Sequence, residues 1–263
     1  MDLGLSNKVA LVCAASRGLG KACAEVLSQE GATVAICGRD LATLEVTAAG
    51  ITEQTGHEIF PFSCDLSEHD QVDDLVSQVV AKCGRLNIIV HNAGGPPSKP
   101  AAAVTDTEWD AALRLNLQSL IWLTQAAVPA MRQEGGGRII AITSVSVKHV
   151  LDNMVLSNTT RLGVAGFAKT LANELAPDNI LVNVVCPGPT ATQRMKDIIA
   201  TQAEQKGLPE DEVAQAWTKQ IPLGRLGEPA ELASVVAFLA SDKASFITGA
   251  VIAVDGGMAR SPI

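Results

Sequence analysis

The sequence predicts an α/β fold in which a doubly wound, seven-stranded parallel sheet is flanked by helices. Short apolar runs alternate with longer helical patterns from one end of the chain to the other, as in repeated strand–helix–strand units. The runs are almost continuously Val, Ile, Leu and Ala, which is typical of strands buried on both faces. The chain is 47% hydrophobic and 18% charged, a globular composition without a linker. We therefore expect a single domain over residues 1–263.

Seven apolar runs are the expected strands, and six helical patterns are the expected helices. The strands are expected at Lys8–Ala14, Thr33–Cys37, Glu58–Ser63, Asn87–His91, Arg138–Thr143, Leu181–Cys186 and Ala250–Val254. The helices are expected at Leu19–Glu30, Asp40–Gln54, Glu68–Cys83, Asp106–Arg132, Val155–Glu174 and Glu228–Ala240. Ser67 and Thr105, each followed three residues later by an acid, are the expected caps of the third and fourth helices.

Two stretches interrupt the regular alternation, and both follow expected strands. They are Gly94–Ala103, rich in Gly and Pro, and Pro187–Pro222, whose helical pieces are polar. In an open parallel sheet, ligands bind beyond the carboxyl ends of the strands, so these stretches are the expected walls of an active site. The first stretch also fits an ordinary surface loop, whereas the length of the second favours a substrate lid at residues 187–222.

Charge and composition exclude several classes of function. The net charge of −8 is spread along the chain without a basic tract, which argues against nucleic acid as a partner. No apolar run approaches the roughly 18–20 residues that span a bilayer, and the amino terminus lacks the features of a signal peptide. The six cysteines form no Cys-x-x-Cys pair, so we expect reduced thiols and no metal site. We expect a cytoplasmic protein that does not bind membranes.

A glycine-rich segment follows the first expected strand and leads into a helix. It covers residues 13–20, with the sequence CAASRGLG. Gly18 and Gly20 let the backbone pass close to a pyrophosphate, and the helix amino terminus supplies amide donors and a favourable dipole. Glycines are common in turns, but the order of strand, glycine turn and helix predicts a dinucleotide site.

This segment resembles the Thr-Gly-x-x-x-Gly-x-Gly loop of the short-chain dehydrogenase/reductase family, with Cys13 and Ala14 in place of the first Thr-Gly. Other family motifs are matched in order by Asp65-Leu66, His91–Gly94, Asn116, Pro187–Thr192 and Thr248–Gly257. The resemblance implies a Rossmann-type domain that binds a nicotinamide cofactor. It implies that the cofactor contacts Ala14, Ser16, Arg17, Gly18, Leu19, Gly20, Arg39, Asp65, Leu66, Asn92, Ala93, Gly94, Arg161, Pro187, Gly188, Thr190 and Thr192.

The end of the second strand predicts which dinucleotide is bound. An acid at this point accepts hydrogen bonds from the 2′-hydroxyl of NAD, whereas a cation suits the 2′-phosphate of NADP. Gly38 stands at the family's acid position, and Arg39 follows it. Arg39 and Arg17 together can neutralise a phosphate, so NADP is the expected cofactor. The alternative is that both arginines are solvated surface charges.

The catalytic residues depart from the family pattern. Family members use a serine and Tyr-x-x-x-Lys, but this chain contains no tyrosine. With Ser144 aligned to the family serine, Ser157 stands where the tyrosine belongs and Arg161 where the lysine belongs. An aliphatic hydroxyl is a far weaker acid than a phenol, and arginine is a rigid, permanently charged fork, so neither exchange is neutral. Arg161 can still donate to the cofactor's ribose hydroxyls.

We expect Ser144, Ser157 and Asn116 to hold a water or a substrate oxygen. Lys148 is the candidate proton donor because it lies four residues after Ser144, in the loop that leaves the fifth strand. The alternative for Lys148 is a solvated loop lysine, and His149 is a weaker candidate for the same role.

Three functions fit these residues. The family resemblance implies NADPH-dependent reduction of a carbonyl, of the ketone or 3-oxoacyl type. Relatives that reduce enoyl or dienoyl thioesters also lack tyrosine at this position, so reduction of a C=C bond is an alternative. A catalytically impaired NADP-binding sensor or scaffold is a further alternative, although a scaffold has no need of the retained Ser144 and Asn116.

The expected partners are a small-molecule or acyl substrate and further copies of the chain. The apolar helix Val155–Leu175 and the terminal segment Thr248–Ile263 resemble the surfaces through which family members associate. We expect a homotetramer, or else a dimer. Acyl-carrier proteins, acyl thioesters, sugars and small cyclic ketones all remain open as substrates.

Overall fold

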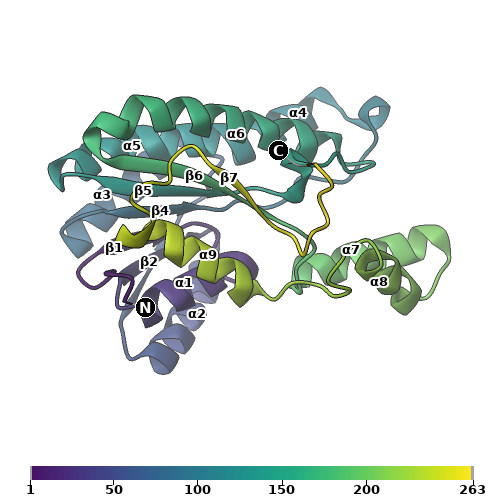
Figure 1. Cartoon of the computed structure of the whole chain (residues 1–263), viewed down its shortest axis with the longest axis horizontal. Coiled ribbons are helices and arrows are strands. Elements are labelled where there is room, and N and C mark those ends of the chain that lie inside the picture. Colours follow the sequence, from purple (N-terminus) through teal and green to yellow (C-terminus); the bar gives the residue numbers. More distant parts are fainter. Residues whose placement is uncertain (1, 262–263) are drawn as a thin grey trace.

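The computed structural model describes residues 2–261, so Met1, Pro262 and Ile263, which belong to the expected domain, lie outside the described residues. One parallel sheet has the strand order β3-β2-β1-β4-β5-β6-β7 (Figure 1), which confirms the predicted fold class. The strands are β1 (Val9–Val12), β2 (Thr33–Gly38), β3 (Ile59–Ser63), β4 (Ile88–His91), β5 (Gly137–Ile142), β6 (Ile180–Pro187) and β7 (Val251–Val254).

Helices cover both faces of this sheet (Figure 1). One layer is α3 (His69–Cys83), α5 (Ser119–Gln133) and α6 (Val155–Leu175), and the other is α1 (Gly18–Gln29), α2 (Leu41–Thr55) and α9 (Pro229–Ala240). Successive strand residues supply the two cores in turn: Leu11 packs with the first layer, and Ala10 and Val12 pack with the second. No helix within residues 2–261 is long and apolar enough to cross a bilayer.

The strand order changes direction between β1 and β4, and in doubly wound sheets the ligand crevice lies outside the carboxyl ends of the strands at this point. Strand β1 pairs with β2 on one side and with β4 on the other, with Val12 opposite Val90. The connections that leave β1 and β4 therefore diverge, and this is the point at which doubly wound sheets bind ligands.

One of the two predicted helix caps is present. Helix α4 (Asp106–Leu113) begins after Thr105, whose hydroxyl accepts from the N–H of Glu108 while the Glu108 carboxylate accepts from the N–H of Thr105. The prediction for Ser67 was wrong. Helix α3 begins one residue later than expected and has no side-chain cap, because the Ser67 hydroxyl donates to Asp65 Oδ1 at 2.7 Å.

The predicted helix Asp106–Arg132 is two α-helices joined by a π-helical turn, η2 (Arg114–Gln118). Asn116 lies inside this turn, and its Nδ2 donates to the carbonyl oxygen of Ala112 at 3.2 Å. The side chain thus takes a carbonyl that an α-helical backbone N–H would otherwise use. A wider turn of this kind frequently marks a functional position.

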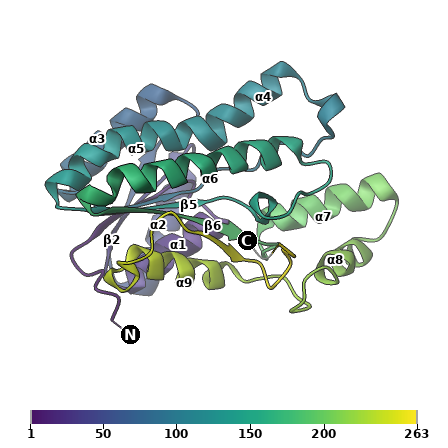
Figure 2. The same ribbon diagram turned by 45° about the horizontal axis from the view of Figure 1, so that its top comes forward.

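The stretch from Pro187 to Pro222 contains two helices, α7 (Gln193–Lys206) and α8 (Glu210–Thr218). Figures 1 and 2 show that both helices extend beyond the carboxyl ends of the strands, away from the two helical layers. Met195 and Ile199 of α7 pack against Val213 of α8, with Trp217 beside them. These side chains hold the two helices together, and Ile221 with Trp217 also packs against Val145 and Met258 of the main body.

Candidate active site

The loop between β1 and α1 forms a tight backbone cradle. A Cβ atom added to Gly20 would lie 2.5 Å from the carbonyl oxygen of Ala14, so only glycine lets the first turn of α1 pack so closely on the loop. Ala14 and Gly18 have positive φ angles of 47° and 60°. Arg17 precedes α1, and its side chain makes no cap hydrogen bond. The amides at this helix terminus therefore fit an anion such as a pyrophosphate.

Segments far apart in the sequence meet at this loop. Asn92, which follows β4, donates a hydrogen bond from Nδ2 to the carbonyl oxygen of Ala14 at 3.4 Å. Thr192, which follows β6, places its Cγ2 3.7 Å from the position of a Cβ atom on Gly18. The crevice between β1 and β4 is thus bordered by the β6 connection, as the sequence motifs require.

The carboxyl end of β6 is held against the segment that follows β7. Pro187 is the last residue of β6, and a Cβ atom on Gly188 would lie 2.7 Å from the Cα of Asp255. Thr190 then fixes the turn, because its Oγ1 donates to the carbonyl oxygen of Gly188 at 3.0 Å. These contacts set the direction in which the chain leaves for α7.

The residues after β2 present an exposed cation and no free acid. Arg39 is exposed and makes no ion pair with any residue of 2–261. Asp40 caps α2, and hydrogen bonds from the Thr43 hydroxyl and from the first amides of the helix lower the pKa of its carboxyl group. A Cβ atom on Gly38 would make only ordinary contact, at 3.5 Å. The Asp40 carboxylate is thus occupied by the amides of α2, whereas the Arg39 guanidinium is free to bind a phosphate.

The other predicted cofactor residues lie in the same loops. The Asp65 carboxylate, after β3, accepts from both the N–H and the hydroxyl of Ser67, and Leu66 is buried beside it. The remaining members are Ser16, Leu19, Ala93 and Gly94. All of them therefore follow the carboxyl ends of β1, β3 or β4.

The predicted catalytic residues gather around the end of β5. Ser144 lies two residues after the end of β5, and its Oγ accepts from the N–H of Ser146 at 3.1 Å. Ser157 is buried in the first turn of α6, and its hydroxyl makes no hydrogen bond within residues 2–261. Arg161, one turn further along α6, donates from Nη1 to the carbonyl oxygens of Thr143 at 2.6 Å and of Ile142 at 3.5 Å. The turn η3 (Val145–Val147) packs against α6.

Arg161 is a buried cation without a counterion. Arg161 is only 8% exposed, and no carboxylate within residues 2–261 lies within ion-pair distance of it. Burial lowers its pKa to about 10; a Cys186 thiolate would oppose this shift, and the positive charge of Arg194 adds to it. Its Nε has no hydrogen-bond partner. A cation in this position is stabilised when polar groups or an anion approach it.

His91 and Asn116 supply unpaired acceptors to the same region. The Ser119 hydroxyl donates to the carbonyl oxygen of Leu115, so it must accept from Nε2–H of His91 at 2.8 Å. This leaves His91 Nδ1 as an unprotonated, buried atom without a partner, like Asn116 Oδ1. Burial, and then the charge of Arg161, lower the pKa of His91 to about 3. The described residues around the end of β5 thus leave two acceptors, the Ser146 hydroxyl and the Arg161 Nε donor unpaired.

Lys148 lies at the end of η3, close to the end of β6. The Cys186 Sγ lies 3.2 Å from Thr143 Oγ1. Burial raises the pKa of the Cys186 thiol, and the hydrogen bond with Thr143 and then the positive charge of Lys148 oppose that shift. The Lys148 ammonium is therefore near the carboxyl ends of β5 and β6. It makes no ion pair within residues 2–261.

Arg194, in the first turn of α7, belongs to this site although no sequence motif indicates it. Its Nη2 donates to the carbonyl oxygen of Pro96 at 3.3 Å and lies 3.3 Å from the position of a Cβ atom on Gly95. Arg194 thereby links α7 to the loop after β4, across the mouth of the crevice. Its position two residues after Thr192 is the only signal in the sequence, and that signal does not reveal the contact.

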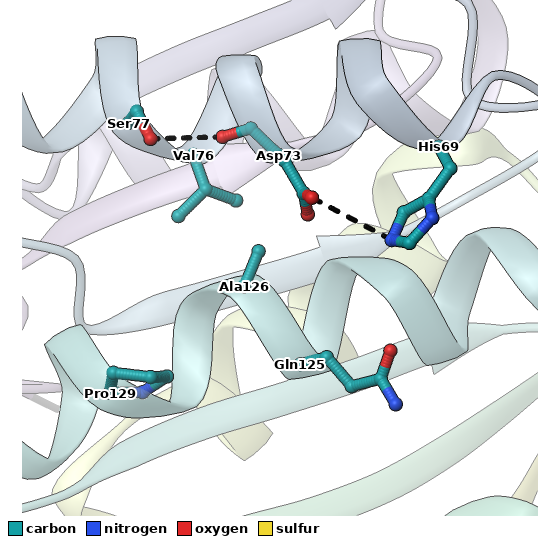
Figure 3. A pocket seen from close by; sticks show the side chains of 7 residues that line it. All are labelled: His69, Asp73, Val76, Ser77, Gln125, Ala126 and Pro129. Atoms are coloured by element: carbon teal, nitrogen blue, oxygen red, sulfur yellow. Dashed lines mark hydrogen bonds and ion pairs between the residues drawn. The ribbon is translucent and has the colours of Figure 1, made fainter.

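The groove between α3 and α5 is separate from this site. Figure 3 shows that it is lined by His69, Asp73, Val76 and Ser77 of α3 and by Gln125, Ala126 and Pro129 of α5. The His69 Nε2 atom faces Asp73 Oδ2 at 3.6 Å. None of the predicted cofactor or catalytic residues lies in this groove.

Comparison with known proteins identifies the family. A family model described as enoyl-(acyl carrier protein) reductase matches residues 13–259. The 3-oxoacyl-(acyl-carrier-protein) reductase FabG of Thermotoga maritima is 36% identical over 257 residues, which cover 97% of this chain and 98% of that protein. The chain belongs to the short-chain dehydrogenase/reductase family. It is an NAD(P)-dependent reductase of that family.

Solved structures of other short-chain reductases agree with this assignment. The L-sorbose reductase of Gluconobacter frateurii, in complex with NADPH and L-sorbose, superposes with a TM-score of 0.95 at 31% identity and covers 99% of this chain and 100% of that one. YwfH, an NADPH-dependent reductase involved in bacilysin biosynthesis, superposes with a TM-score of 0.92 at 28% identity and covers 97% of this chain and 100% of its own.

The buried His91 makes the stability of this short-chain reductase depend on pH. Because the pKa falls from 6.5 in the unfolded chain to about 3 in the folded one, the unfolded state binds more protons between these values. The free energy of unfolding is therefore expected to decrease as pH falls below about 6.5, by up to about 1.4 kcal/mol per pH unit from this group.

Urea unfolding of the wild type and of His91→Asn at several pH values between 7.5 and about 4.5 measures this effect. The variant is expected to lose the corresponding part of the pH dependence, whereas His149→Asn, at an exposed position, keeps it. Identical pH profiles for the wild type and His91→Asn would contradict the prediction.

Proposed function

We propose that this reductase transfers a hydride from NADPH to the carbonyl carbon of a ketone or 3-oxoacyl substrate, without a catalytic tyrosine. The observation that carries the proposal is the position of Arg161, which is fixed to the carbonyl oxygen of Thr143 beside Ser144 and lies one turn from Ser157 on α6. The relatives named above include a 3-oxoacyl reductase and an L-sorbose reductase, and both names describe reduction of a carbonyl compound.

NADP fits the residues of the crevice better than NAD does. The Gly20 cradle and the amino terminus of α1 suit the pyrophosphate. The 2′-phosphate is assigned to Arg39 with Arg17, since the nearby Asp40 carboxylate is occupied by its own helix. The structure of L-sorbose reductase contains NADPH, which supports the same cofactor here. Arg161 and Asn92 are assigned to the nicotinamide side of the cofactor.

The proposed chemistry requires one hydride and one proton. NADPH, when bound, supplies the hydride. Ser144 Oγ accepts from the Ser146 N–H and keeps its hydroxyl hydrogen, so Ser144 and Ser157 donate to the carbonyl oxygen and hold it in place. Lys148 donates the proton to that oxygen and regains one from water, because its ammonium is a stronger acid than either serine hydroxyl. Asn116 holds a water or the substrate oxygen.

Reduction of a conjugated C=C bond is the second candidate. The observation that favours it is the family model matched by residues 13–259, which is described as an enoyl-(acyl carrier protein) reductase. The same cofactor position serves both reactions, but the proton then goes to carbon and not to oxygen. Substrate panels with ketones and enals separate the two.

We further propose that residues 187–222 act as a substrate lid on the single domain. Helices α7 and α8 have a small core of their own, formed around Met195 and Val213. The Arg194 bond to Pro96 connects them to the loop after β4. Trp217 and Ile221 anchor the end of this stretch against Val145 and Met258, so α7 is the part suited to opening and closing over a ligand.

The choice of cofactor is tested at Arg39. Arg39→Gln is expected to weaken NADPH binding about tenfold or more, because a charge-assisted bond to the 2′-phosphate is lost, while NADH binding changes little. Fluorescence titration with both nucleotides measures this. Arg85→Gln, which removes an exposed cation before the amino end of β4, is the control. Equal affinity of the wild type for NADPH and NADH, or an NADPH affinity of Arg39→Gln equal to that of the wild type, would contradict the assignment.

The proton donor is tested at Lys148. Lys148→Met is expected to lower kcat about 100-fold or more for the carbonyl that the wild type reduces, with NADPH affinity retained. The measurement is NADPH oxidation with a panel of ketones, 3-oxoacyl thioesters and enals, and Lys82→Met on α3 is the control. Unchanged turnover in Lys148→Met removes the lysine from the mechanism. Turnover of enals alone supports the C=C candidate.

We propose that the reductase is a homotetramer, with a dimer as the smaller assembly. Leu162 on α6 is 57% exposed, Phe246 before β7 is fully exposed, and β7 is an edge strand. Sedimentation velocity is expected to show a tetramer or dimer that Leu162→Asp dissociates. Val46→Asp, at an exposed position on α2, is the matched control. A wild-type monomer at micromolar concentration contradicts the proposal.

A further inference from the structure

Three cations without carboxylate partners surround the mouth of the crevice. They are Lys148 after β5, Arg161 on α6 and Arg194 on α7, and none makes an ion pair with a residue of 2–261. Lys99, in the facing loop, contrasts with them because it pairs with Glu108 at 2.6 Å. These three cations lie toward the ends of β5 and β6, whereas Arg39, which is also unpaired, follows β2, where the 2′-phosphate of the cofactor is assigned.

The three side chains are held near one another by contacts from different elements. Arg161 is fixed on Thr143, and the charge of Arg194 is close enough to add to the pKa shift that burial imposes on Arg161. Lys148 approaches Cys186. The Cys186 Sγ lies 3.2 Å from the Thr143 Oγ1. Burial raises the pKa of the Cys186 thiol, so this thiol is neutral near pH 7 and supplies no negative charge.

Such a cluster is unfavourable by itself. Like charges repel more strongly when one of them is buried, and Arg161 also has an unpaired Nε. The chain as a whole carries a net charge of −8, yet no carboxylate within residues 2–261 pairs with any of these three cations. An anion placed among the three side chains would remove the repulsion and accept their free N–H groups.

We propose that this cluster binds a carboxylate on the substrate, so that the substrate is an oxo acid and not a neutral ketone. Arg194 is the specificity-determining residue, because its planar guanidinium is exposed at the mouth and suits a carboxylate. The proposal rests on the carbonyl reduction proposed above and adds the charge of the substrate to it.

The phosphates of the cofactor are the other possible source of the anion. They are assigned to the Gly20 cradle and to the arginines after β1 and β2, whereas Arg161 and Lys148 stand at the ends of β5 and β6. Strands β1 and β5 are separated in the sheet by β4. The cluster is therefore placed beside the reacting carbonyl and not beside the adenosine half of the dinucleotide.

The test compares oxo acids with their methyl esters as substrates. The pairs are pyruvate and methyl pyruvate, acetoacetate and methyl acetoacetate, and levulinate and methyl levulinate, each assayed by NADPH oxidation. The wild type is expected to prefer at least one acid over its ester by tenfold or more in kcat/KM. Arg194→Gln is expected to reduce that preference about tenfold through KM, and Arg194→Lys to retain part of it. Lys196→Gln, an exposed cation on the same helix, is the control.

The same variants are titrated with NADPH, and the acids and esters are titrated into the NADP⁺ complex by calorimetry. Equal kcat/KM for acids and esters, or an unchanged acid preference in Arg194→Gln, overturns the proposal. A loss of NADPH affinity in Arg194→Gln equal to the loss of acid preference also overturns it and assigns the anion to the cofactor. If no carbonyl is reduced, the proposed function fails, and tighter binding of the acids than of the esters in the wild type, but not in Arg194→Gln, still supports the carboxylate site.

Discussion

Helix α6 is joined to the carboxyl end of β5 by the hydrogen bond from Arg161 Nη1 to the carbonyl oxygen of Thr143. This bond fixes the rest of the site, because Ser144 follows Thr143 and Ser157 precedes Arg161 by one turn. The turn η2, with Asn116, is held on the same helix: Leu117 approaches within 3.2 Å of the position of a Cβ atom on Gly163. Loss of this hydrogen bond would cost about 1.5–3 kcal/mol, because the donor is a buried cation.

The strands were predictable because their pattern is simple. The strands in the middle of the sheet are buried on both faces and therefore almost continuously apolar, and the partly buried edge strands β3 and β7 are apolar enough to be recognised as well. The strand boundaries are shifted from the expected ones by one or two residues. The caps were less predictable. Ser67 and Thr105 have the same spacing to an acid, but Asp65 stands two residues before Ser67 and takes its hydroxyl.

The π-helical turn at Asn116 escaped prediction for a related reason. The apolar periodicity runs from α4 into α5 without a visible break, and the bond from Asn116 to Ala112 is a local choice of one side chain. Within the site, the motif residues lie where strand ends were expected. Arg194 did not emerge, because its contact with Pro96 joins residues 98 positions apart. The low pKa of His91 likewise depends on burial that no motif encodes.

The hydrogen bond between Arg194 and Pro96 has a consequence for how firmly α7 is held. It joins α7 to the loop after β4, so α7 moves away from this loop only when the bond is broken. A single bond from a partly exposed guanidinium to a neutral carbonyl contributes about 1–2 kcal/mol. This contact alone is therefore too weak to fix α7 against the loop after β4, and the position of α7 depends on its packing against the rest of the chain as well.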